Sequence, residues 1–148
     1  MASTITLKWK DNMAFESVID GHKLTIDTSV DMGGHDKGPR PKVLMLLSLA
    51  GCSGLDIASL FHKMRVTVER LEIEVSGELS DTVPAVFTSF HVTYRVWGDN
   101  PDFNKIVKAI RLSEEKYCGV AVMYRKIGAV TYDIVVNDEK IDVESYPQ

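Results

Sequence analysis

Residues Pro41–Met64 read PKVLMLLSLAGCSGLDIASLFHKM, a long and mostly apolar segment that the rest of the fold has to cover. Proline suits the first turn of a helix, and the central turns are apolar on nearly every side, which is typical of a helix buried on most faces. The sequence therefore predicts a long helix over Pro41–Met64. Because one sheet face covers only one side of such a helix, we expect a second copy of the chain to cover the rest, as in an intimate homodimer.

Strands are expected on both sides of this helix, because apolar and polar residues alternate there with period two. An Asp20-Gly21 pair between two strand-like runs favours a hairpin turn. The expected strands are 4–10, 13–19, 23–27, 66–77, 87–97 and 129–136, and two further helices are expected over 101–111 and 113–127. Since most strands come in hairpins, we expect an α+β fold with antiparallel sheets wrapped around the buried helix, in one domain spanning 1–148.

The composition is that of an ordinary globular protein, with 148 residues, 45% hydrophobic and 26% charged residues, and a net charge of −4. Lysine and arginine residues are scattered, so nothing indicates a nucleic-acid partner. The N-terminal residues alternate like a strand and lack the apolar core of a signal peptide. The apolar run Val43–Cys52 is about half the length that spans a bilayer. We therefore expect a cytoplasmic protein without a membrane anchor.

The chain contains two cysteines, Cys52 and Cys118, both in apolar and helix-patterned stretches. In a chain that is not secreted, the default state of such residues is the reduced thiol. They are either small buried hydrophobes or a reactive pair. Gly51 and Gly54 bracket Cys52, which indicates either close packing or the approach of another backbone or a ligand. No spacing typical of metal sites joins the four histidines and the cysteines, so no metal is expected.

Two segments carry a family resemblance: GGHDKGPRPKVLMLLSLAGCSGLDI at 33–57 and LSEEKYCGV at 112–120. Together they resemble the OsmC family, relatives of the organic hydroperoxide resistance proteins, and the order of elements matches along essentially the whole chain. The resemblance implies an OsmC-like fold, an intertwined homodimer with active sites at the subunit interface, and thiol-dependent reduction of organic hydroperoxides. It also implies that Cys52 is the peroxidatic cysteine, that Cys118 is the resolving one, and that an external dithiol is the reductant, with no cofactor.

An organic peroxide requires an apolar pocket, and Leu49, Tyr117 and Met123 lie near the two cysteines in sequence. They are candidates to line such a pocket, although the same residue types are also common in protein cores. Asp56 follows Cys52 by one helical turn on the same side, where an ionised carboxylate opposes formation of a thiolate.

The activating groups expected from the resemblance are missing. Active family members use an arginine from the N-terminal strands and a glutamate near the start of the cysteine helix. Here the turn over 10–14 reads KDNMA, and Lys42 and Val43 occupy the positions of the glutamate. Arg40, at the junction of loop and helix, is a candidate replacement cation. The sequence favours a hydroperoxide reductase, with a non-catalytic redox sensor or a small-molecule-binding protein as the alternative.

Overall fold

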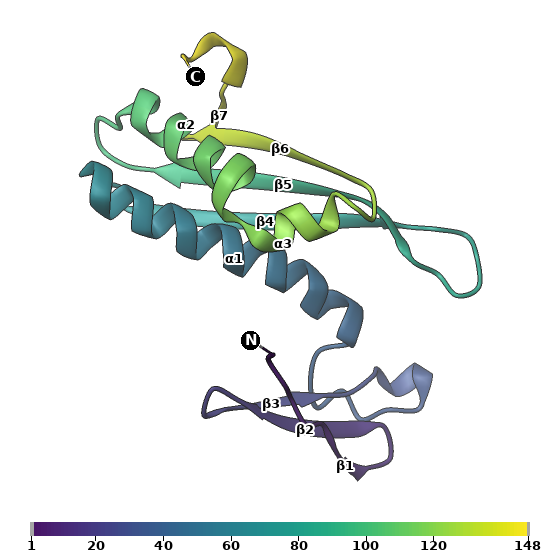
Figure 1. Cartoon of the computed structure of the whole chain (residues 1–148). Coiled ribbons are helices and arrows are strands. Elements are labelled where there is room, and N and C mark those ends of the chain that lie inside the picture. The colour runs from purple at the N-terminus through teal and green to yellow at the C-terminus, as the bar shows by residue number, and fades with distance from the viewer. Residues whose placement is uncertain (1, 148) are drawn as a thin grey trace. The chain divides into compact units, whose positions relative to one another are not determined.

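The computed structural model describes residues 2–147 and has an α+β organisation (Figure 1). Two compact units divide between residues 45 and 46, and each is described by itself. The helix α1, Pro41–Met64, begins and ends at the predicted residues and contains the point of division.

The first unit contains a three-stranded antiparallel meander in the order β1-β2-β3. Its strands are β1 (Lys8–Asp11), β2 (Ala14–Ile19) and β3 (His22–Ile26). Asp20 and Gly21 both have positive φ, 51° and 83°, as a type I′ hairpin turn requires, which confirms the predicted turn. The first strand is shorter than predicted, because pairing with β2 begins at Lys8.

The glycine-rich loop that follows β3 is organised by a buried carboxylate. Asp27 is only 3% exposed, and its side chain accepts hydrogen bonds from the backbone N–H groups of Thr28, His35 and Lys37. A Cβ atom at Gly34 would lie 2.1 Å from the carbonyl oxygen of Thr28, so only glycine fits there. The loop contains one short 3₁₀ turn, η1 (Val30–Met32), and its path is fixed by these contacts.

The second unit contains a four-stranded sheet in the order β4-β5-β6-β7. Its strands are β4 (Arg70–Leu79), β5 (Phe87–Trp97), β6 (Ala129–Val136) and β7 (Glu139–Lys140). The prediction of antiparallel sheets holds for the β4–β5 and β6–β7 pairs but is wrong for β5–β6, which are parallel. A helical crossover separates β5 from β6, and such a connection returns the chain in the same direction.

The crossover differs from the predicted pair of helices. Helix α2 (Phe103–Leu112) is capped by Asp102, whose side chain accepts from the N–H of Lys105. The backbone of Ser113 is helical, and its hydroxyl donates to the carbonyl oxygen of Ser53. The helix continues instead into a π-helical turn, η2 (Ser113–Tyr117), and only then does α3 (Gly119–Tyr124) begin.

Helix α1 lies along the sheet of the second unit, as Figure 1 shows. Gly54 of α1 sits against Ile73 of β4, where an added Cβ would be 3.0 Å from the Ile73 side chain. Within the single chain α1 buries one stripe, formed by Leu49, Ser53, Ile57 and Phe61.

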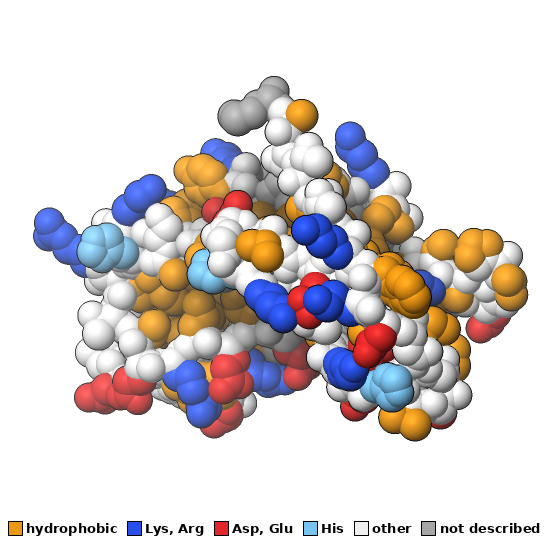
Figure 2. Space-filling model, turned by 90° about the horizontal axis from the view of Figure 1, so that it is seen from below, with side chains coloured by type: hydrophobic (Ala, Val, Ile, Leu, Met, Phe, Trp, Pro, Cys, Tyr) orange, Lys and Arg blue, Asp and Glu red, His pale blue; other side chains and the backbone are white. Residues whose placement is uncertain are grey.

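The opposite side of α1 is exposed, with Leu47 at 62% and Leu55 at 77%. By length and composition alone α1 could cross a membrane, a property that it shares with core helices of soluble proteins. Figure 2 shows further apolar side chains at the surface, with charged side chains beside them. Burial of α1 on most faces, as predicted, is therefore not achieved by one chain.

Candidate functional site

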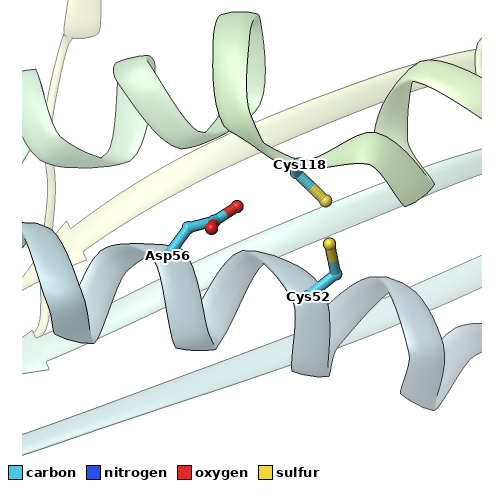
Figure 3. Close-up of side chains that lie close together, drawn as sticks. All are labelled: Cys52, Asp56 and Cys118. Atoms are coloured by element: carbon cyan, nitrogen blue, oxygen red, sulfur yellow. The ribbon is translucent and has the colours of Figure 1, made fainter.

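The fold brings the two cysteines together, although Cys52 and Cys118 lie far apart in the sequence. Cys52 rises from the middle of α1, and Cys118 points down toward it from the bend between η2 and α3 (Figure 3). Their sulfur atoms, together with a carboxylate oxygen of Asp56, all lie within 4.8 Å of one another. Both cysteines are free thiols, Cys52 half-buried and Cys118 fully buried. An approach of the two sulfurs by at most about 2.8 Å would give the roughly 2.05 Å separation of a disulfide.

The sulfur of Cys118 is held by hydrogen bonds. Cys118 is the N-cap of α3, and its sulfur accepts from the N–H of Ala121 at 3.4 Å. The hydroxyl of Ser53 donates to the same sulfur at 3.3 Å. Burial raises the pKa of the Cys118 thiol; the bonds from Ser53 and Ala121 oppose that rise, and the adjacent Cys52 thiol adds to it. Cys118 is therefore a well-oriented thiol that water does not reach.

A chain of polar groups leads from Ser53 through Tyr94 to Glu114. The Tyr94 hydroxyl donates to the carboxylate of Glu114, which is 0% exposed. Arg125 donates to the same carboxylate and to the Glu114 backbone carbonyl, in both cases at 2.8 Å. Burial, with the negative charge of Glu114, raises the pKa of Tyr94, so this phenol stays protonated. The network fixes the π-helical turn that carries Cys118.

Asp56 is the third member of the cluster. One of its carboxylate oxygens, Oδ2, is buried and has no hydrogen-bond partner among the described residues. Figure 3 shows its side chain directed into the gap that the two sulfurs share. A buried carboxylate oxygen without a partner is costly, so it indicates a site that binds a ligand or a cation.

The predicted pocket residues lie in different environments. Leu49 is fully buried and belongs to the core, whereas Tyr117 and Met123 are 56% and 57% exposed. Their assignment to a substrate pocket stays a prediction. Arg40 is exposed and lies in the first unit. There the pKa of Asp31 is lowered mainly by a hydrogen bond from Ser29, with a smaller contribution from Arg40. The role of Arg40 as the activating cation also stays a prediction.

Sequence reasoning did not identify Ser53, Tyr94 or Arg125 as parts of the site. Ser53 follows Cys52 directly and Tyr94 occupies a regular strand position, so neither stood out in the sequence. The charge of Glu114, close to Cys118 in sequence, is compensated by Arg125, eleven positions along the chain. One part of the site could be found from the sequence, because the spacing of Cys52 and Asp56 places both residues on one side of α1.

Comparison with known proteins agrees with this fold. The sequence profile of the family described as OsmC-like protein matches residues 34–133. The chain is 31% identical over 132 residues to Protein YhfA of Escherichia coli strain K12, a match that covers 88% of this chain and 95% of YhfA.

Two solved structures show the same fold at low identity. An OsmC-like protein from Mycoplasma pneumoniae has a TM-score of 0.77 at 15% identity, covering 92% of this chain and 97% of that one. An organic hydroperoxide resistance protein OsmC from Legionella pneumophila has a TM-score of 0.64 at 17% identity, covering 90% and 98%. Profile, relative and fold agree, and the chain belongs to the OsmC-like protein family.

Proposed function

We propose that this protein reduces organic hydroperoxides with its two thiols, Cys52 as the peroxidatic and Cys118 as the resolving cysteine. The observation that carries the proposal is the convergence of the two free sulfurs within 4.8 Å. The difference in exposure supports the order of roles, because Cys52 is half-buried and accessible to a peroxide while Cys118 is fully buried. Relatives of the same fold include one named as an organic hydroperoxide resistance protein.

The reaction needs no cofactor. The Cys52 thiolate attacks the terminal oxygen of the hydroperoxide, the O–O bond breaks, and the alcohol leaves after taking up a proton. The Cys52 sulfenic acid then condenses with the Cys118 thiol, which forms the disulfide and releases water. An external dithiol reduces the disulfide by thiol–disulfide exchange and returns both cysteines to thiols.

A second candidate is a redox sensor or a small-molecule-binding protein without turnover. The observation that favours it is the Asp56 carboxylate within 4.8 Å of both sulfurs, because a negative charge there opposes the thiolate. The lack of the expected arginine in the turn over 10–14 points the same way. The sensor would form the disulfide once and would depend on a separate protein for the response.

The proposal includes a cytoplasmic homodimer in which residues 1–148 act as one domain. The family profile runs across both compact units, which supports a single domain. The exposed leucines of α1, Leu47 and Leu55, support an intertwined partner, because a second copy would remove this apolar surface from water. Sedimentation should give a dimer, and Leu55→Glu should weaken it; a monomeric wild-type protein would contradict the proposed assembly.

The direct test mixes reduced protein with tert-butyl hydroperoxide or cumene hydroperoxide and a dithiol, and follows the loss of peroxide. We expect catalytic consumption that Cys52→Ser abolishes. In the absence of the dithiol, the Cys118→Ser variant should react at Cys52 and accumulate sulfenic acid, because the resolving thiol is missing. Ser145→Ala, at an exposed position outside α1, serves as the control.

Consumption no faster than in buffer, or unchanged by Cys52→Ser, would contradict the enzymatic proposal. A single stoichiometric oxidation to the disulfide without turnover would favour the sensor.

A further inference from the structure

The cluster of Cys52, Asp56 and Cys118 offers more than a dithiol. It presents two sulfurs and one carboxylate oxygen, all within 4.8 Å of one another, from two separate segments of the chain. These donor types match those that bind borderline-soft divalent ions such as Zn²⁺, whereas Mg²⁺ and Ca²⁺ prefer oxygen alone. We propose that reduced Cys52, Asp56 and Cys118 form a binding site for a zinc-class divalent cation.

The distances fit such an ion after a small adjustment. With Zn–S bonds of about 2.3 Å and tetrahedral angles, two sulfur ligands lie about 3.8 Å apart. Because the two sulfurs lie within 4.8 Å of each other, they need to approach by at most about 1 Å, which is within the reach of a rotation at Cys52. Three protein ligands leave the fourth position of the tetrahedron to water or another small ligand.

The surroundings of the cluster favour a cation independently of these distances. The Asp56 Oδ2 atom is buried and finds no hydrogen-bond partner within residues 2–147, and a metal ion would satisfy it. The sulfur of Cys118 already receives an O–H bond from Ser53 and an N–H bond from Ala121. Such donors orient a ligating thiolate and spread its charge, in the way that outer-shell groups do in metal sites.

Metal binding and peroxide reduction are separate properties of the same atoms. Binding requires only that the thiols are reduced, so it does not depend on the proposed hydroperoxide activity. Both sulfurs lose their capacity as thiolate ligands in the disulfide, so an occupied site and an oxidised site exclude each other.

The test titrates reduced, metal-free, full-length protein with Co²⁺ under anaerobic conditions. Thiolate ligation gives a near-ultraviolet charge-transfer band, and tetrahedral geometry gives visible bands. We expect saturation at one equivalent per chain, and displacement of the Co²⁺ by Zn²⁺. Cys52→Ser and Asp56→Asn should each weaken binding by more than the roughly 10- to 100-fold that loss of an outer-shell partner costs. Asp99→Asn, at an exposed loop position, should bind as the wild type does.

Two outcomes would overturn the proposal: no thiolate-to-cobalt band in the wild-type protein, or binding that Cys52→Ser and Asp56→Asn leave unchanged. Circular dichroism of each variant separates a lost ligand from a lost fold. If a variant does not fold, wild-type protein alkylated at Cys52 takes its place and should not bind. Neither overturning outcome bears on peroxide consumption, so the proposed function is tested apart from the metal site.

Discussion

The buried pair of Glu114 and Arg125 should be a principal source of stability for the segment that carries Cys118. Glu114 is 0% exposed, and Arg125 makes two hydrogen bonds of 2.8 Å to it. In Arg125→Met, the aliphatic stem remains but the buried carboxylate loses its counter-charge. Removing one partner of a buried pair costs about 3–5 kcal/mol. Because the Arg125 side chain is 37% exposed, solvent screening reduces this cost, and we expect about 2–3 kcal/mol.

Urea unfolding measures this difference directly. With a slope of about 1.5 kcal/mol per M, the midpoint should fall by about 1.5 M, measured at one protein concentration because dimerisation also shifts it. The double variant Glu114→Gln with Arg125→Met should recover part of the loss, since no buried charge is then left unpaired. A midpoint shift below about 0.3 M would contradict the stabilising role of this ion pair. So would a double variant that loses more free energy of unfolding than the two single variants lose together.

Three further predictions concern the cysteines and α1. Brief alkylation of the native protein should label Cys52 at least about tenfold faster than Cys118, which is 0% exposed, as peptide mapping would measure. Because burial raises the pKa of the Cys118 thiol in the folded protein, the same thiol loses its proton at a lower pH in the unfolded chain. In urea titrations, the free energy of unfolding should thus keep this contribution below about pH 8.5 and decrease above that pH. Thermal melts should give Gly54→Ala, whose Cβ would lie 3.0 Å from the Ile73 side chain, a lower melting temperature than Gly119→Ala, whose Cβ would have nothing within 4 Å.

Each of these predictions has its own contradiction. Equal labelling of the two cysteines would mean that Cys118 is accessible. A Cys118→Ala variant whose stability falls as steeply above pH 8.5 as that of the wild type would assign the slope to another group. If Gly119→Ala lowers the melting temperature as much as Gly54→Ala does, the contact with Ile73 is not the cause.

The helix, the hairpin turn and most strands were predictable because local patterns determine them. Helix α1 and strands β5 and β6 begin and end at the predicted residues. The parallel pairing of β5 and β6 was missed because it depends on the path of the crossover and not on the pattern of either strand. The π-helical turn was missed because Ser113 and the acidic residues after it resemble a helix start, while tertiary bonds decide their conformation.

The site was predictable only in part. The pairing of Cys52 with Cys118 was expected from the resemblance, and the structure places their sulfurs together. The bonds from Ser53 to Cys118 and from Arg125 to Glu114 join positions far apart along the chain or on different elements, so no local spacing reveals them. Asp56 was noticed as a charge beside Cys52, but its unpartnered oxygen is visible only in three dimensions.

The most direct test of the thiol pair oxidises the reduced protein with one equivalent of tert-butyl hydroperoxide and maps its peptides by mass spectrometry. The proximity of the two sulfurs predicts a Cys52–Cys118 disulfide within one chain, with the loss of two hydrogen atoms and one alcohol released. Two cysteines that remain open to alkylation, or a Cys52 that stays at the sulfenic acid while Cys118 stays a thiol, would contradict the proposed pairing.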